Sequence, residues 1–181
     1  MISMVKTEQM RYGPLRISGI CYDSLADGEG VRAAIYFSGC GHNCPGCHNP
    51  STHDFFAGQI VTDQVLDTIV AEINKRPYLS GITLTGGDPM YRPEQLYRAL
   101  KYILIRVNRP ITVWLYTGFL WEDMADMEII GLIDVVVDGP FDQDLADKRL
   151  VYRGSSNQRI IDTKLSRVNE SIILYDGLCE Y

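Results

Sequence analysis

The chain has 181 residues, 46% of them hydrophobic and 22% charged, which predicts one globular domain spanning residues 1–181 and excludes a disordered chain. Its 23 acidic residues outnumber its 17 basic ones, giving a net charge of −6, and no cluster of Lys and Arg indicates a nucleic-acid partner. Neither a leader peptide nor an apolar stretch of bilayer length is visible, so we expect a cytoplasmic protein without membrane contact.

Strands and helices are predicted to alternate along the chain. Four short runs rich in β-branched and aromatic residues predict buried strands at 33–37, 82–85, 111–116 and 134–137. Between the first two strands, Thr62 is a good cap for a helix with one apolar face. Pro93 suits the first turn of a second helix, which has to end before Pro110, and a shorter third helix is expected within 121–130.

This alternation predicts an α/β fold in which parallel strands are covered by helices. A complete eight-fold β/α barrel needs about 250 residues, so the chain is long enough only for a partial barrel or an open sheet. Active sites of such folds lie at the carboxyl edge of the strands. Four polar or small residues follow the four predicted strands in turn: Cys40, Gly86, Thr117 and Asp138.

Three of the five cysteines, Cys40, Cys44 and Cys47, fall in one Gly- and Pro-rich loop with the spacing Cys-x3-Cys-x2-Cys. Without a secretion signal, such clustering favours metal or redox chemistry over disulfides. Three thiolates can bind three irons of a [4Fe-4S] cluster and leave the fourth iron open for a ligand. No role is assigned to the isolated Cys21 and Cys179.

A zinc site is the alternative interpretation of the same loop. His42 or His48 would complete a set of three thiolates and one imidazole. Structural zinc sites usually take their ligands from two separated pairs, however, and no second pair follows in this sequence. We therefore favour the iron–sulfur cluster.

A second loop, with Gly86, Gly87 and Asp88, follows the second strand directly. Alone, such a string predicts a turn, but here the glycines would let backbone approach a ligand and Asp88 could accept a hydrogen bond from an ammonium group. Thr117 would place a hydroxyl near the same ligand or cap a turn. Asp138 is expected to form a turn, with a role in the site as the alternative, and His53 is expected to be solvated.

Together the two loops resemble the signature of the radical S-adenosylmethionine (SAM) superfamily. The resemblance implies a partial barrel of the radical SAM type, in which the amino and carboxylate groups of SAM chelate the open iron. It also implies that Asp88 contacts the SAM amino group. If Thr117 does not cap a turn, its position after the third strand would put its hydroxyl near the SAM ribose or carboxylate. One electron from the reduced cluster then cleaves SAM into methionine and a 5′-deoxyadenosyl radical, the chemistry that the cofactors supply.

Further strings resemble one family within this superfamily, the activating proteins of anaerobic ribonucleoside-triphosphate reductase. They include 27–32, 37–40, 44–49, 84–89, 114–118, 137–139 and 153–159. By this resemblance Gly46, Cys47, His48 and Gly87 lie around SAM. The family usually has Tyr where His48 stands, so this ring can lie against the adenine, bind a metal or lie outside the site.

The family resemblance also implies the partners. The substrate would be one glycine of the reductase large subunit, the electron donor a flavodoxin-like protein, and the assembly a homodimer or a complex with the reductase. Activation of another glycyl-radical enzyme, of the pyruvate formate-lyase type, is a second possibility, and a non-catalytic zinc module is a third. The roles of the string 153–159 and the identity of the target glycine stay open.

Overall fold

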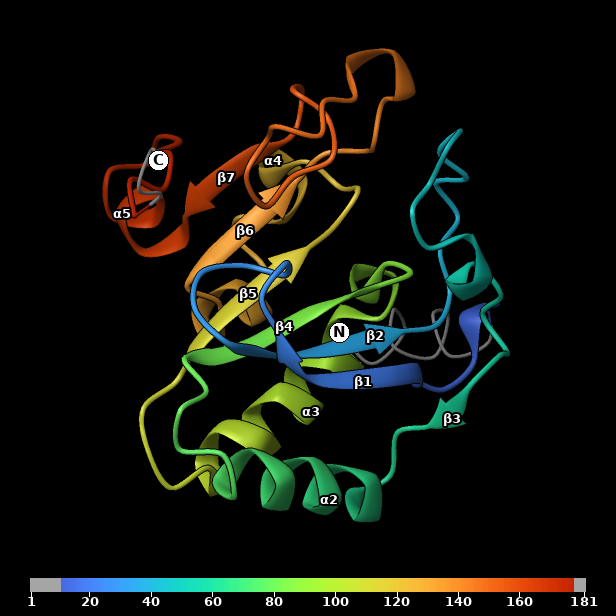
Figure 1. Ribbon diagram of the computed structural model, residues 1–181, viewed down its shortest axis with the longest axis vertical. Helices are drawn as coiled ribbons and strands as arrows, with labels where there is room; N and C mark the ends of the chain where they lie inside the picture. The colour runs from blue at the N-terminus through green and yellow to red at the C-terminus, as the bar shows by residue number, and fades with distance from the viewer. Residues whose placement is uncertain (1–10, 178–181) are drawn as a thin grey trace.

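The computed structural model describes residues 11–177, and seven strands form one sheet in the order β3-β1-β2-β4-β5-β6-β7 (Figure 1). The four predicted strands are its centre, and they run parallel to one another as expected. Their bounds lie within one residue of the predicted ones: β2 (Arg32–Phe37), β4 (Gly81–Gly86), β5 (Thr112–Tyr116) and β6 (Val135–Asp138). The central part of the fold prediction is therefore confirmed.

Both edges of the sheet are antiparallel, which the sequence analysis did not foresee. On one side β1 (Arg16–Ser24) pairs with β2, and the short β3 (Gln59–Ile60) pairs with β1. On the other side β7 (Arg159–Asp162) pairs with β6. The result is a mixed sheet with a parallel centre, as in a partial barrel.

The two main helices begin where their sequence signals predict, and the second ends before Pro110 as expected. Helix α2 (Asp63–Asn74) follows Thr62, whose side-chain oxygen accepts a hydrogen bond from the Val65 amide at 3.4 Å. Helix α3 (Pro93–Arg106) starts with its proline. The third predicted helix is instead the short α4 (Trp121–Met124) followed by a 3-10 turn. The remaining short elements are α5 (Thr163–Val168) and 3-10 turns at Pro50–Thr52, Pro89–Tyr91, Glu128–Leu132 and Gln143–Leu145.

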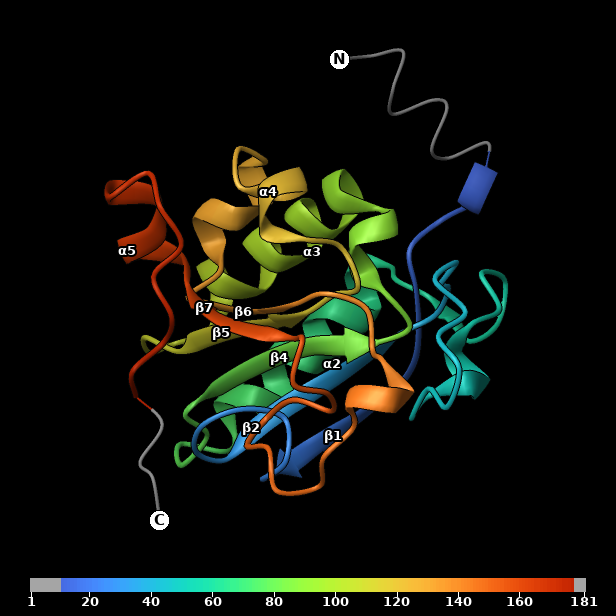
Figure 2. The ribbon, with the colours of Figure 1, turned by 90° about the horizontal axis from the view of Figure 1, so that it is seen from above.

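The helices α2, α3 and α4 cover one face of the sheet, and the main hydrophobic core lies between them (Figure 2). Ile35, Leu84 and Leu115 point to this side from three neighbouring strands and are buried with Leu100 and Ile103 of α3. Each such side chain contributes about 1.5–3 kcal/mol when it is fully buried. Within the described residues, no helix is long and apolar enough to cross a membrane.

The opposite face of the sheet is covered by loops and corresponds to the inside of the partial barrel (Figure 2). A smaller hydrophobic cluster lies here, built around Trp114 of β5. The rings of Tyr152 and Tyr175 meet Trp114 edge-on, with ring centroids 5.4 and 5.5 Å away. This inner face therefore carries side chains on which a further layer can pack.

Arg32, at the start of β2, lies at the amino-terminal end of the inner face. Its side chain is fully buried and donates to Thr83 Oγ1 at 2.8 Å and to the carbonyl oxygens of Ile82 and Thr112 at 2.7 and 2.9 Å. Its guanidinium also lies over Trp114, 5.5 Å from the ring centroid. Burial lowers the pKa of Arg32 to about 10. One cation thus connects β2, β4 and β5 from the inside.

Candidate active site

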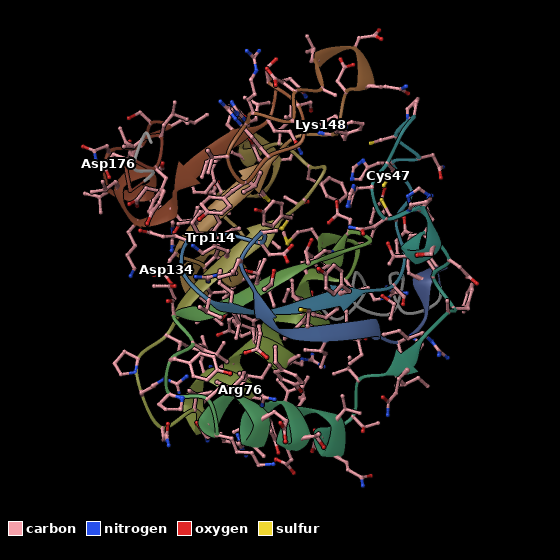
Figure 3. The ribbon with its side chains drawn as sticks, viewed as in Figure 1. Cys47, Arg76, Trp114, Asp134, Lys148 and Asp176 are labelled. Carbon is pink, nitrogen blue, oxygen red and sulfur yellow. The ribbon has the colours of Figure 1, made fainter. Side chains whose placement is uncertain are left out.

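The polar loops predicted from the sequence gather at the carboxyl edge of the parallel strands. The cysteine loop follows β2, Gly86 ends β4, Thr117 follows β5 and Asp138 ends β6. The cysteine loop projects from the sheet at this edge, and Cys47 lies on it (Figure 3). The parallel strand directions therefore bring these loops to one edge of the sheet, as expected.

Backbone hydrogen bonds hold the start of the cysteine loop from two sides. On one side, the amides of Gly39 and Cys40 donate to the carbonyl oxygens of Thr52 and His53 at 2.7 and 3.1 Å. On the other side, the amide of Asp88 donates to the Gly39 carbonyl oxygen at 2.8 Å. The cysteine loop and the Gly-Gly-Asp loop are thus fixed against each other before any ligand binds.

The two glycines of the second loop make this close approach possible. Gly86 has φ of +101°, which favours glycine, and a Cβ there would lie 2.6 Å from the Phe37 amide nitrogen. A Cβ at Gly87 would lie 2.6 Å from the Gly39 carbonyl oxygen. The close neighbours of both glycines are backbone atoms of the protein, so their approach to a ligand stays a prediction.

The carboxylate of Asp88 joins three loops. It is 1% exposed and accepts hydrogen bonds from His42 Nε2 at 2.8 Å, Thr117 Oγ1 at 3.0 Å, the Gly118 amide at 2.8 Å and the Met90 amide at 3.0 Å. The structure therefore brings Asp88 and Thr117 together, as the sequence suggested. A carboxylate offers about four acceptor positions, so a ligand ammonium group reaches it only by displacing one of these donors.

His42 belongs to this group of loops as well. Its ring packs against Tyr91 and Phe119, with ring centroids 5.4 and 4.8 Å away, and a Cβ at Gly118 would come within 2.5 Å of it. His42 was a candidate zinc ligand, but its Nε2 is directed at the Asp88 carboxylate. His48, the other candidate, is exposed near the tip of the loop, as is Gly46.

The three cysteines of the loop are free thiols and are half-buried. Burial raises the pKa of the Cys40 thiol to about 11, and Asp88 nearby adds to the effect. Cys47 Sγ accepts from the Asn49 amide at 3.4 Å and lies 3.3 Å from His53 Nε2. Donors beside a thiolate sulfur tune the reduction potential of an iron–sulfur cluster.

His53 was therefore predicted wrongly as a solvated residue. It is half-buried, its ring faces Cys47, and its carbonyl oxygen accepts from Cys40. It lies six residues beyond Cys47, after the Pro50–Thr52 turn, and this turn brings it back to the loop. Such a return depends on the loop conformation, which the sequence did not reveal.

Asp138 also differs from its prediction as a turn-forming residue. Its carboxylate is fully buried at the end of β6, accepts from the Trp121 amide at 2.8 Å and forms an ion pair with Arg159 of β7. Arg159 also pairs with the exposed Glu122 at 2.8 Å. Asp138 thus anchors α4 and β7 to the central sheet.

The donor set fits an iron–sulfur cluster. Three thiols in one short loop are the ligands that such a cluster takes from a protein. Among residues 11–177, no three His, Cys, Asp or Glu side chains converge closely enough to hold one metal ion. A [4Fe-4S] cluster binds one thiolate per iron, so its three ligands need not meet at a single point. Cys21 lies exposed on β1, and Cys179 lies outside the described residues.

Comparison with known proteins agrees with this donor set. The family described as "4Fe-4S single cluster domain" matches residues 26–161. The anaerobic ribonucleoside-triphosphate reductase-activating protein of Escherichia coli strain K12 is 41% identical over 139 residues, which cover 74% of this chain and 90% of the relative. Its counterpart from enterobacteria phage T4 is 35% identical over 138 residues, covering 75% and 86%, and that of Haemophilus influenzae is 36% identical over 147 residues, covering 78% and 94%.

Proposed function

Because this chain belongs to the family of anaerobic ribonucleoside-triphosphate reductase-activating proteins, we propose that it activates such a reductase by removing one hydrogen atom from a glycine Cα of the large subunit. The main support is the cysteine loop, which is fixed to the Gly-Gly-Asp loop at the carboxyl edge of a partial barrel. The resulting glycyl radical is delocalised between the flanking amides, so the transfer is downhill.

The ligands of the cluster are Cys40, Cys44 and Cys47, with one cluster per chain and one iron left without a protein ligand. When both cofactors are bound, the reduced cluster and SAM supply a 5′-deoxyadenosyl radical as the hydrogen acceptor. The electron comes from a reduced flavodoxin-like protein. The 5′-deoxyadenosyl radical would take the glycine hydrogen atom on its 5′ carbon and become 5′-deoxyadenosine.

The chain itself binds and orients SAM. We assign its methionine end to Gly86, Gly87 and Asp88, because they lie at the end of β4 beside the base of the cysteine loop. The ammonium group of SAM would then displace one of the donors that Asp88 holds. Thr117, which already contacts Asp88, is available to the ribose or carboxylate. The outer part of the cysteine loop contains Gly46, Cys47 and His48, of which Gly46 and His48 are exposed. We assign these three residues to the adenosine side of the cofactor.

The inner face is the side from which we expect a protein substrate to approach. Within residues 11–177, the main helices lie on the other face of the sheet, and loops cover this one (Figure 2). We expect a cytoplasmic enzyme that works in a complex with the reductase and without nucleic acid or membrane. A homodimer of activating proteins is compatible with such a complex.

Electron paramagnetic resonance tests this function directly. The reduced protein is mixed with SAM and the reductase large subunit without oxygen, and a glycyl doublet is expected. Cys44→Ala, which removes one cluster ligand from a surface loop, should give no doublet although the protein still folds. A doublet formed only with a pyruvate formate-lyase-type enzyme would show that the partner is another glycyl-radical enzyme. Zinc without iron and sulfide in the purified protein would contradict the cluster.

A further inference from the structure

The long connection between β6 and β7, residues 139–158, has no role in the proposed chemistry. It rises from the sheet at the end where the cysteine loop lies, and Lys148 marks its outer part (Figures 1 and 3). It includes most of the string 153–159, whose function the sequence left open. The hydrogen bonds of this string show what it does.

Side chains of the string tie the two ends of the connection together. Gln158 accepts from the amides of Gly154 and Ser155 at 2.9 and 3.2 Å through Oε1 and donates to the Gly139 carbonyl oxygen at 3.1 Å through Nε2. Asn157 donates to the Pro140 carbonyl oxygen at 2.8 Å. The side-chain amides of Asn157 and Gln158 thus fix the geometry of a segment that has little regular secondary structure.

A second set of bonds supports the segment from its interior. Ser155 is fully buried, and its Oγ accepts from the Asp142 amide at 3.1 Å. The Ser156 amide donates to the Leu145 carbonyl oxygen at 2.9 Å. Residues 141–152 are therefore held in one conformation by the string that follows them. Surfaces ordered in advance lose less conformational entropy when a partner binds.

The two ends of residues 141–152 place them between the inner face and the cysteine loop. At one end, Tyr152 packs on Trp114 and its carbonyl oxygen accepts from Tyr116 Oη at 2.9 Å. Near the other end, Gln143 lies beside Gly46, where an added Cβ would be 3.0 Å from its Oε1. A polypeptide that approaches the cysteine loop from the inner face would therefore meet this segment.

We propose that residues 141–152 form the surface that receives the glycine-bearing segment of the reductase. Ser155 and Gln158 position this surface on the activating protein. The inference rests on the function proposed above. Leu145 and Val151 are 44% and 49% exposed and are the large apolar side chains that this segment offers to the partner. The helix-covered face offers no comparable route, because its core is closed by α2 and α3.

The test compares two double variants in anaerobic activation assays. Leu145→Ser with Val151→Ser removes the apolar contacts, and Leu165→Ser with Val168→Ser is the control on α5, where the two side chains are 48% and 81% exposed. We expect the first variant to raise the reductase concentration needed for half-maximal glycyl radical formation by about tenfold, because two apolar side chains are no longer buried in the complex. The radical yield at saturating reductase and SAM cleavage without reductase should stay unchanged.

Gln158→Ala tests the positioning role separately. It should also raise the half-saturating reductase concentration, while SAM cleavage without reductase continues at the wild-type rate. An unchanged half-saturating concentration in the Leu145/Val151 variant, or an equal rise in the α5 control, would overturn the inference. Loss of SAM cleavage in the Leu145/Val151 variant would also overturn it, because the segment would then belong to the cofactor site. If wild-type protein forms no glycyl radical with the reductase, the proposed function itself fails.

Discussion

Replacing Asp88 with Asn tests how the site is held together before cofactors bind. The substitution keeps the shape of the side chain but turns one of two buried oxygens into an NH2 group. Oδ2 accepts from His42, Thr117 and the Gly118 amide, and Oδ1 accepts from Thr117 and the Met90 amide. The one remaining side-chain oxygen can therefore accept from only one of the two backbone donors, the Gly118 amide or the Met90 amide.

The energetic cost follows from which partners can adapt. The hydroxyl of Thr117 can rotate and the ring of His42 can change tautomer, so both can accept from the new NH2 group. A backbone amide cannot, and either Gly118 or Met90 keeps a buried N–H without a partner. Such a group costs about 1–3 kcal/mol. For a chain of this size, that lowers the Tm by about 2–4 °C for each kcal/mol.

Urea unfolding of the cluster-free protein, followed by circular dichroism, measures this difference without any contribution from iron. Asp54→Asn is the matched control, because Asp54 is exposed and its single partner, the Phe56 amide at 2.8 Å, can still be accepted by the Asn oxygen. We expect the control to change the free energy of unfolding by less than about 0.5 kcal/mol.

An unfolding midpoint that Asp88→Asn leaves unchanged would refute this reasoning. If that variant also needed more SAM for half-maximal cleavage, the carboxylate would act mainly on the ligand, as the family resemblance implies. A loss of iron that matches the loss of stability would instead show that Asp88 supports the cysteine loop.

Three further outcomes are expected. Gly118→Ala should push the His42 ring away from its carboxylate partner and lower the unfolding midpoint, which urea titration measures. Arg159→Ala leaves the buried Asp138 without its cation and should cost about 3–5 kcal/mol in the same assay. Glu122→Gln, which removes the exposed ion pair between Glu122 and Arg159, should cost less than about 1 kcal/mol at neutral pH. Hydrogen bonds from Arg159 lower the pKa of Glu122 from 4.5 to about 2. The ionised Glu122 therefore stabilises the fold fully above pH 4.5, and this contribution is lost as the pH falls towards 2. Wild-type protein and Glu122→Gln should have the same unfolding midpoint at that low pH.

The sequence predicted the centre of this fold because its signals are local. Thr62 and Pro93 mark helix starts through their own backbone chemistry, and the β-branched runs form parallel strands that are buried on both faces. Because these strands run parallel, the loops that follow them were correctly predicted to gather at one edge of the sheet. The same reasoning failed at 121–130, where one helix was expected and α4 is followed by a separate 3-10 turn.

What the sequence did not show depends on contacts between distant segments. The edge strand β7 is fixed by the Arg159–Asp138 pair, whose members are 21 residues apart. His53 returns to Cys47 through a turn, and Gln158 reaches back 19 residues to Gly139. Each of these bonds forms only once the chain has folded, so no local sequence pattern predicts it.

The Arg32 guanidinium cross-links the starts of the parallel strands. Because β2, β4 and β5 are bonded to one buried cation with Trp114 lying against it, these strands resist sliding past one another. Any rearrangement that a binding partner requires therefore has to come from the loops at the opposite, carboxyl edge of the sheet. The sheet then acts as a fixed frame against which those loops adjust.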